Sequence, residues 1–287
     1  MNLSHNRGDI ENLLGFKSKK YTGINMFLSF IIGAFLTLIF YALLFPFYRM
    51  GKFNLINMFF HGGEFNRSII PYFIIFFSMW TFAILFIKYK KIKLQKKVLY
   101  LKFIPEDDNG FILSQATAND IINNIYVSVD NPKKFLLLNR IERALANLQN
   151  IGRISDVAET LESQTIIDEQ YTESTYTVAK GFIWAIPVMG FIGTVLGLSD
   201  AIGGFGTVLG AEFSPEKLKD SLTGVTGGLA VAFETTLIAL VAALFIQLVL
   251  TFINNFEEDF LDSCSDYCHK NIIAKLRTIG SENDIRN

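Results

Sequence analysis

The chain has 287 residues, of which 51% are hydrophobic and 28 are Phe, and its formal net charge is -1. This apolar content exceeds what a soluble domain needs for its core. The near-zero charge argues against a nucleic-acid partner. The two cysteines, Cys264 and Cys268, do not form a disulfide framework. We therefore expect a protein whose surroundings include a lipid bilayer.

Long uncharged segments predict an all-α polytopic membrane protein with four transmembrane helices. The first two segments, 24–47 and 69–87, are rich in Phe, Leu and Ile. The last two lie within 181–256 and contain more Gly, Ala and Thr. Each is near the roughly 20 residues that cross a hydrocarbon core. The polar first twenty residues hold no apolar core, so no cleavable signal peptide is expected.

The placement of Lys and Arg predicts that both termini are cytoplasmic. Basic residues precede the first span, and a lysine cluster follows the second between Lys88 and Lys97. The expected organisation is an N-terminus at 1–23, two spans with an outer loop at 24–87, a cytoplasmic block at 88–180, two spans at 181–256 and a cytoplasmic tail at 257–287.

The block at 88–180 reads as helical. A turn is expected at 104–110, and a short helix at 114–128. A clearer helix begins at Asn131-Pro132 and carries an apolar stripe at helical spacing, composed of Phe135, Leu138, Ile141, Leu145 and Leu148. Arg140, Glu142 and Arg143 lie off that stripe and favour a solvated face over a docking surface. After Ser155 no Gly or Pro precedes the third span, which predicts one long helix entering the membrane, and the tail after Phe256 is expected to be helical.

The third span carries small residues on one helix face, and Thr194 lies beside them. The face consists of Gly190, Gly193, Gly197, Ala201 and Gly204. Small residues allow a neighbouring helix to approach closely. Pro187 removes a backbone hydrogen bond and can kink the helix. Asp200 lies near the outer end, where it is either an interfacial residue or part of a channel mouth.

The fourth span contains Thr236, Ala239, Ala243 and Gln247 on one face, with Glu234 and Thr235 close in sequence. Glu234 is about 200° from Thr236 around the helix. If Thr236 faces an ion path, Glu234 faces a neighbouring helix or subunit. If Glu234 faces the path, the stripe that contains Thr236 serves only for packing. That stripe has four members, so its length favours the arrangement in which Thr236 faces the path. The plainer interpretation of such a threonine is a hydrogen bond to its own helix.

Other patterns are weak. Cys264, Cys268 and His269 have helical spacing but do not make a tetrahedral metal site. The sequence contains no Walker loop and no Ser, His and Asp set, so neither an enzyme nor a cofactor is expected.

The segments IPVMGFIGTVLGL at 186–198 and TLIALVAAL at 236–244 resemble the MotA/TolQ/ExbB proton-channel family. The resemblance covers roughly 160–255. Four spans with a large intervening block look more like the MotA branch, whereas the threonine of the third span looks more like TolQ and ExbB. Pro187 occupies the position of a proline in the MotA-type third span.

The resemblance implies a homopentamer around two copies of a single-span MotB/TolR/ExbD-like partner, in the bacterial cytoplasmic (inner) membrane. The partner supplies a membrane Asp that binds the transported H⁺ or Na⁺. Thr194 and Thr236 match the family threonines beside the ion path. Glu234 departs from the pattern, because the acidic residue of TolQ and ExbB falls where this chain has Val231.

Three hypotheses follow. The first is a stator subunit that uses an ion gradient to move a partner complex, with motility, outer-membrane energisation, transport and phage defence all open. The second is a non-conducting membrane scaffold that recruits partners through the cytoplasmic block. The third is an intramembrane enzyme using Glu234 and Asp200, which lacks an accompanying nucleophile or metal set.

Overall fold

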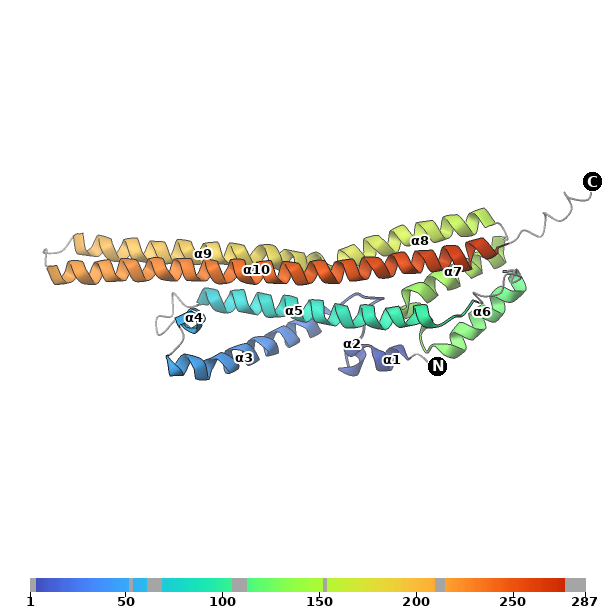
Figure 1. The fold of residues 1–287 in the computed structure, drawn as a ribbon, viewed down its shortest axis with the longest axis horizontal. Coiled ribbons are helices and arrows are strands. Elements are labelled where there is room, and N and C mark those ends of the chain that lie inside the picture. Colours follow the sequence, from blue (N-terminus) through green and yellow to red (C-terminus); the bar gives the residue numbers. More distant parts are fainter. Residues whose placement is uncertain are drawn as a thin grey trace, which may run out of the picture. The chain divides into compact units, whose positions relative to one another are not determined.

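The computed structural model describes residues 4–51, 54–60, 69–104, 113–151, 154–209 and 215–276. Within these ranges the regular elements are helices, and an isolated parallel bridge joins Leu113 and Leu276. The α-helices (Figure 1) are α1 His5–Gly8, α2 Ile10–Leu13, α3 Met26–Met50, α4 Asn54–Asn57, α5 Ile69–Lys96, α6 Gln115–Ser128, α7 Leu136–Ile151, α8 Ile154–Thr175, α9 Thr177–Leu209 and α10 Pro215–Asn271. Three short 3-10 helices are η1 Lys97–Tyr100, η2 Pro132–Lys134 and η3 Ile273–Lys275.

Four stretches of the described chain are long and apolar enough to span a membrane, which confirms the predicted architecture. They are Met26–Met50, Ile69–Tyr100, Asp156–Gly203 and Ser221–Lys275. The tail after the fourth span is helical as predicted, because it continues α10 without interruption. The predicted turn at 104–110 lies mostly outside the described residues.

The long third helix is confirmed, with one interruption that the sequence did not indicate. Tyr176 forms a turn between α8 and α9. Its N–H donates to the Glu173 carbonyl at 3.1 Å, one residue short of the α-helical partner. The carbonyl of Thr172 instead accepts the Thr175 hydroxyl at 2.6 Å. A hydroxyl that competes with the backbone in this way explains the local break.

Residue contacts divide the chain into two compact units. Unit 1 comprises 1–25, 86–176 and 252–287, and unit 2 comprises 26–85 and 177–251. Unit 2 therefore holds the apolar part of all four candidate spans. Unit 1 holds the N-terminal segment, the polar block and the tail.

Helix α5 is the central element of unit 2. A Cβ built on Gly33 of α3 would lie 2.6 Å from the Trp80 Cα, so α3 and α5 approach backbone to backbone. The Trp80 ring packs on Phe182 of α9 with centroids 4.6 Å apart, and Phe82 packs on Phe245 of α10 at 5.8 Å. Within this unit α5 accordingly lies between α3 and the α9–α10 pair (Figure 1).

Unit 2 also leaves large apolar side chains exposed. On α9 and α10 these include Trp184, Val188, Phe191, Phe233 and Leu237. A water-facing surface of this kind would be costly over so large an area. We therefore infer that this surface of unit 2 contacts lipid hydrocarbon or other protein.

Unit 1 is built around the predicted apolar stripe of α7, and every member of that stripe is buried. Helix α6 begins with a capping box in which the Ser114 hydroxyl accepts the Thr117 N–H and the Thr117 hydroxyl accepts the Ser114 N–H. The helix expected from Asn131-Pro132 instead starts as the 3-10 turn η2, and α7 follows from Leu136.

Arg140 corrects the predicted solvated face of α7. The residue is only 1% exposed, its Nε donates to the Asp168 Oδ2 at 2.8 Å, and its Nη1 donates to the Ser265 Oγ at 2.9 Å. The prediction was wrong for Arg140 because the stripe alone does not reveal that α8 and α10 cover this side of α7. Arg143 is exposed and Glu142 is half-buried.

A buried lysine fastens the N-terminal segment to α5 in unit 1. The Lys91 ammonium lies 2.6 Å from the Glu11 Oε2 and 3.5 Å from the Asp9 Oδ2, and it donates to the Gly23 carbonyl at 2.7 Å. The second Glu11 oxygen accepts the Asn25 N–H at 2.6 Å. The buried Lys91 ammonium and the buried Glu11 carboxylate therefore both have hydrogen-bond partners, which offset the cost of removing them from water.

Replacing Arg140 with Met should destabilise unit 1, because Asp168 would keep a buried charge without its cation. We expect a loss of about 3–5 kcal/mol in the free energy of unfolding, whereas the double variant Arg140→Met/Asp168→Leu should recover most of it. Denaturant unfolding of the detergent-solubilised chain measures both. A single variant as stable as the parent would contradict the assigned pair.

His5 gives unit 1 a pH-dependent stability. The residue is 1% exposed, and its Nε2 lies 3.6 Å from the Asp9 Oδ2. Burial lowers the pKa of His5 below its usual 6.5, and Lys134 and Lys91 act in the same direction, whereas Asp9 and Asp130 oppose it. A folded-state pKa below the unfolded one means that the stabilisation is complete above the unfolded pKa and is lost as the pH falls below it.

The stability of the parent chain should therefore rise between about pH 5.5 and 7.5, and His5→Gln should flatten that rise. Thermal unfolding across this range provides the measurement. His269 is exposed, so His269→Gln should keep the parental profile. Equal profiles for the parent and His5→Gln would contradict the assignment.

Candidate functional site

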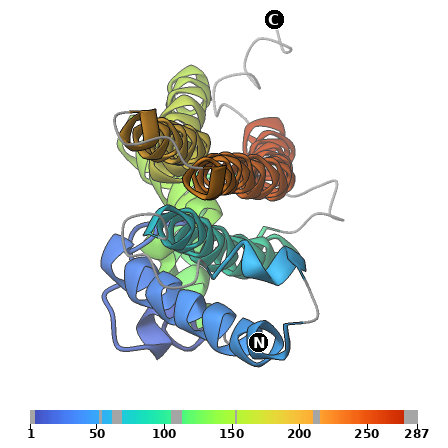
Figure 2. The same cartoon turned by 90° about the vertical axis from the view of Figure 1, so that its left-hand side faces the viewer.

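The candidate site is the seam where α9 and α10 pack together in unit 2. The two helices run side by side in both views of the ribbon (Figures 1 and 2). On α9 the buried positions are Gly190, Gly193, Gly197 and Ala201, which is the small-residue face expected from the sequence. On α10 the buried positions that face them include Gly228, Ala232, Thr235 and Ala239.

The seam has no room for larger side chains. A Cβ built on Gly190 would lie 2.6 Å from the Ala239 Cβ, and one built on Gly193 would lie 2.5 Å from the Thr235 Oγ1. A Cβ on Gly197 would meet the Gly228 carbonyl oxygen at 2.8 Å. The last contact involves backbone, so it cannot be relieved by rotating a side chain.

Thr236 links the two helices. Its hydroxyl lies 3.1 Å from the Gly190 carbonyl on α9 and 3.3 Å from the Ala232 carbonyl of its own helix. Thr235, one position earlier, is buried in the seam and donates to the Ala232 carbonyl at 2.9 Å. Because these carbonyls accept the hydroxyl protons, each threonine hydroxyl oxygen can still accept a hydrogen bond or ligate a cation through its lone pairs.

Thr194 follows the glycine face of α9. The residue is half-buried, and its hydroxyl donates to the Phe191 carbonyl at 2.6 Å. Pro187 lies inside α9, half-buried. A proline has no N–H, so the Ile183 carbonyl loses its helical donor. The polar atoms available along this part of α9 are therefore oxygens that accept hydrogen bonds or ligate a cation.

The remaining sequence-predicted residues lie apart from the seam or beside it. Glu234 is half-buried on α10, and Gln247 is exposed, with its Nε2 3.5 Å from the Thr251 Oγ1. Ala243 is buried, but the buried line then continues through Ile246 and not through Gln247. Asp200 belongs to α9 and its side chain is outside the described part of the chain, as is Gly204.

Two features were missed by sequence reasoning. Gly228 and Ala232 extend the seam, and their 4,3,4 spacing with Thr235 and Ala239 was a readable signal. The second is a buried pair in unit 1, where the Lys88 ammonium lies 2.9 Å from the Glu257 Oε2. Lys88 is one member of a lysine-rich run, and nothing in its spacing sets it apart.

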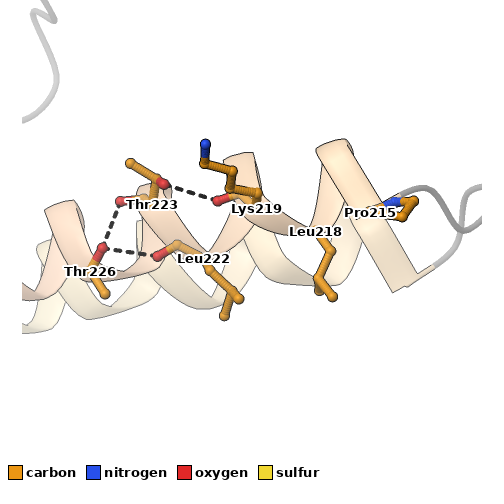
Figure 3. Close-up of a pocket in the computed structure, with 6 residues that line it drawn as sticks. All are labelled: Pro215, Leu218, Lys219, Leu222, Thr223 and Thr226. Carbon is orange, nitrogen blue, oxygen red and sulfur yellow. Dashed lines mark hydrogen bonds between the residues drawn. The ribbon is translucent and has the colours of Figure 1, made fainter.

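The beginning of α10 forms a separate hollow of about 410 Å³ (Figure 3). The hydroxyls on its wall turn to their own helix: Thr223 donates to the Lys219 carbonyl, and Thr226 donates to the carbonyls of Leu222 and Thr223, each at 2.9 Å. These exposed threonines bond within their own helix, as Thr194 does, whereas Thr236 also bonds across the seam. They serve as references for Thr194 and Thr236.

The tail cysteines are packing residues in unit 1. Cys264 and Cys268 are buried and unpaired as thiols, and His269 is exposed. Within the described residues no group of three or more His, Cys, Asp or Glu side chains is arranged to hold a metal ion.

Four apolar helices and a glycine-packed helix pair define a multi-pass helical membrane protein. Residues 130–265 match the model of the MotA/TolQ/ExbB proton channel family. The match covers α7 to most of α10, including the whole seam. No curated protein and no solved structure matches the chain.

Gly197→Ala should weaken the α9–α10 packing, because its methyl group would meet the Gly228 carbonyl. Gly203→Ala on the same helix is the matched control, since no atom lies within 4 Å of its added Cβ. We expect a destabilisation of about 1–3 kcal/mol for Gly197→Ala and none for Gly203→Ala. Unfolding of the chain in detergent measures the difference, and equal stabilities of the two variants would contradict the seam.

Proposed function

We propose that the chain is the stator subunit of an ion-driven motor, in which α9 and α10 line the ion path. The observation that carries the proposal is the glycine-packed seam with a threonine bridging both helices, inside the region that matches the channel family. Such a seam places hydroxyl oxygens at membrane depth, where a polar group is expensive unless it has a use.

The proposed roles of Thr194 and Thr236 are acceptor roles. Each hydroxyl proton is directed at a backbone carbonyl, so each oxygen can accept a hydrogen bond from a protonated carboxyl group or ligate a desolvated Na⁺. Among the side chains that the structure describes, Glu234 is the carboxylate nearest in sequence to Thr236, and it is not one of the buried seam positions of α10. A partner with a single span and a membrane Asp is therefore part of the proposal.

The assembly we propose is a homopentamer around two copies of that single-span, MotB/TolR/ExbD-like partner, in the bacterial inner membrane with both termini cytoplasmic. The exposed apolar surfaces of α9 and α10 support further helix contacts of this kind. Each charge that crosses the membrane releases about 2.3 kcal/mol per 100 mV, so repeated transfers can drive movement of a partner complex.

The double variant Thr194→Val/Thr236→Val should lose ion flux while keeping assembly, because valine fills the same volume without the oxygen. Losing one acceptor to a desolvated ion costs about 1–3 kcal/mol, which corresponds to at least a fivefold loss of flux. The complex purified from its native membrane, reconstituted in vesicles under an imposed potential, provides the measurement for H⁺ and for Na⁺.

The matched control is Thr223→Val/Thr226→Val, which removes two hydroxyls that bond only to their own helix. Native mass spectrometry of both variants reports the subunit count. Undiminished flux in Thr194→Val/Thr236→Val would contradict the proposed path. An assembled particle without flux in the parent would favour the non-conducting scaffold.

A further inference from the structure

The N-terminal segment of unit 1 exposes apolar and basic side chains close together in the chain. Leu13, the last residue of α2, is 64% exposed, and Leu14 after it is 53% exposed. Lys17, Lys19 and Lys20 come next, and all three are exposed. Leucines that only water covers lose the benefit of burial. Leucine together with lysine is the composition of segments that lie in a membrane surface.

Hydrogen bonds fold this segment back onto the residue that precedes the first span. The Glu11 Oε1 accepts the Asn25 N–H at 2.6 Å, and the Glu11 Oε2 accepts the Lys19 N–H at 3.2 Å. The Asn25 side-chain amide donates to the Lys17 carbonyl at 3.4 Å. Met26, the next residue, begins α3 and the first candidate span. The loop that carries both leucines and all three lysines is therefore closed at the point where the chain enters the membrane.

The contact with α5 gives the depth of this loop. The uncharged stretch of α5 ends at Ile87. The ammonium of Lys91, a residue about 6 Å further along the helix axis, lies 2.6 Å from the Glu11 Oε2 and donates to the Gly23 carbonyl at 2.7 Å. Segments that lie in a membrane surface bury their apolar side chains about 5–10 Å deep. The leucines that follow Glu11 are thus within reach of the bilayer surface.

Exposed side chains of α5 support this depth. Phe86 and Tyr89 are exposed, and the Lys90 ammonium lies 5.5 Å from the Phe86 ring centroid. Aromatic rings are enriched where a span meets water, and long lysine side chains extend from there toward the headgroups. The end of the apolar stretch therefore has the composition of a membrane boundary, close to the level of Lys91.

We propose that the segment 13–20 is a membrane-surface anchor that docks on anionic headgroups of the bilayer. Two observations favour the bilayer as its partner. The adjoining span already places the bilayer beside this segment, and the charged side chains of the segment are all exposed lysines, which complement headgroup phosphates. The leucines insert between the headgroups, and the Glu11–Lys91 ion pair connects the anchor to α5. The anchor is independent of the ion path proposed for α9 and α10.

The test places a fluorophore on Leu14→Cys in the full-length chain, reconstituted in nanodiscs whose lipids carry a nitroxide quencher at the headgroup. The native cysteines are buried, so the unsubstituted chain gives the labelling background. Tyr100→Cys is the matched control, because Tyr100 is more exposed than Leu14 but lies about 15 Å beyond Lys91 along α5 and η1. We expect quenching at Leu14→Cys that increases when phosphatidylglycerol replaces phosphatidylcholine, and no such increase at Tyr100→Cys.

The variant Lys17→Gln/Lys19→Gln tests the electrostatic part of the anchor. Lys20 stays unchanged, because its ammonium also lies 4.3 Å from the Tyr21 ring centroid. A lysine close to an anionic bilayer strengthens attachment about fivefold, so the ratio of docked to undocked label should fall at least about tenfold at low KCl. High KCl screens the attraction and should lower this ratio in the chain that keeps both lysines.

The matched charge control is Lys97→Gln/Lys270→Gln, which removes the same charge at exposed positions outside the segment and should leave the quenching unchanged. Quenching at Leu14→Cys no greater than at Tyr100→Cys, no gain from phosphatidylglycerol, or equal losses in the two lysine variants would each overturn the proposal. An excimer band from pyrene on Leu14→Cys would also overturn it, because a second copy of the chain would then cover the leucines. Circular dichroism confirms that every variant is folded.

Discussion

The backbone contact between α9 and α10 is the constraint on which the candidate site depends. A Cβ built on Gly197 would lie 2.8 Å from the Gly228 carbonyl oxygen, and one built on Gly228 would lie 3.0 Å from the Gly197 carbonyl oxygen. This closeness also brings the Thr236 hydroxyl within reach of the Gly190 carbonyl across the seam. In hydrocarbon, where apolar burial contributes little to helix association, such close packing and interhelical hydrogen bonds hold the pair together. The residues that pack α9 against α10 are therefore also the residues of the candidate site.

Unit 1 is held by a different kind of interaction. Lys88, Lys91 and Arg140 are all buried, and each has a carboxylate within 3 Å. These pairs tie α5, α7, α8, α10 and the N-terminal segment together, with hydroxyls and carbonyls satisfying further donors. Buried ion pairs impose geometry more than they add net stability. This division is physically consistent: small apolar surfaces pack in unit 2, and matched charges fix the arrangement in unit 1.

Much of the membrane architecture could be predicted from the sequence, because an uncharged apolar run of sufficient length permits few alternatives. The glycine face of α9 was equally readable, since helical periodicity fixes which residues share a side. The seam positions of α10 were predicted only in part. The predicted stripe began at Thr236 and ended at Gln247, which is exposed, whereas the seam runs through Gly228, Ala232 and Thr235.

The sequence by itself determined the span count, the apolar stripe of α7 and the hydroxyl-bearing, small-residue character of the last two spans, because each depends on periodicity along one helix. Tertiary structure decided which charges are buried and which threonine bridges two helices. Those outcomes depend on residues far apart in the chain, such as Arg140 with Asp168 and Lys88 with Glu257. Periodicity shows which way a side chain faces on its own helix, but only the packed structure shows what lies opposite it.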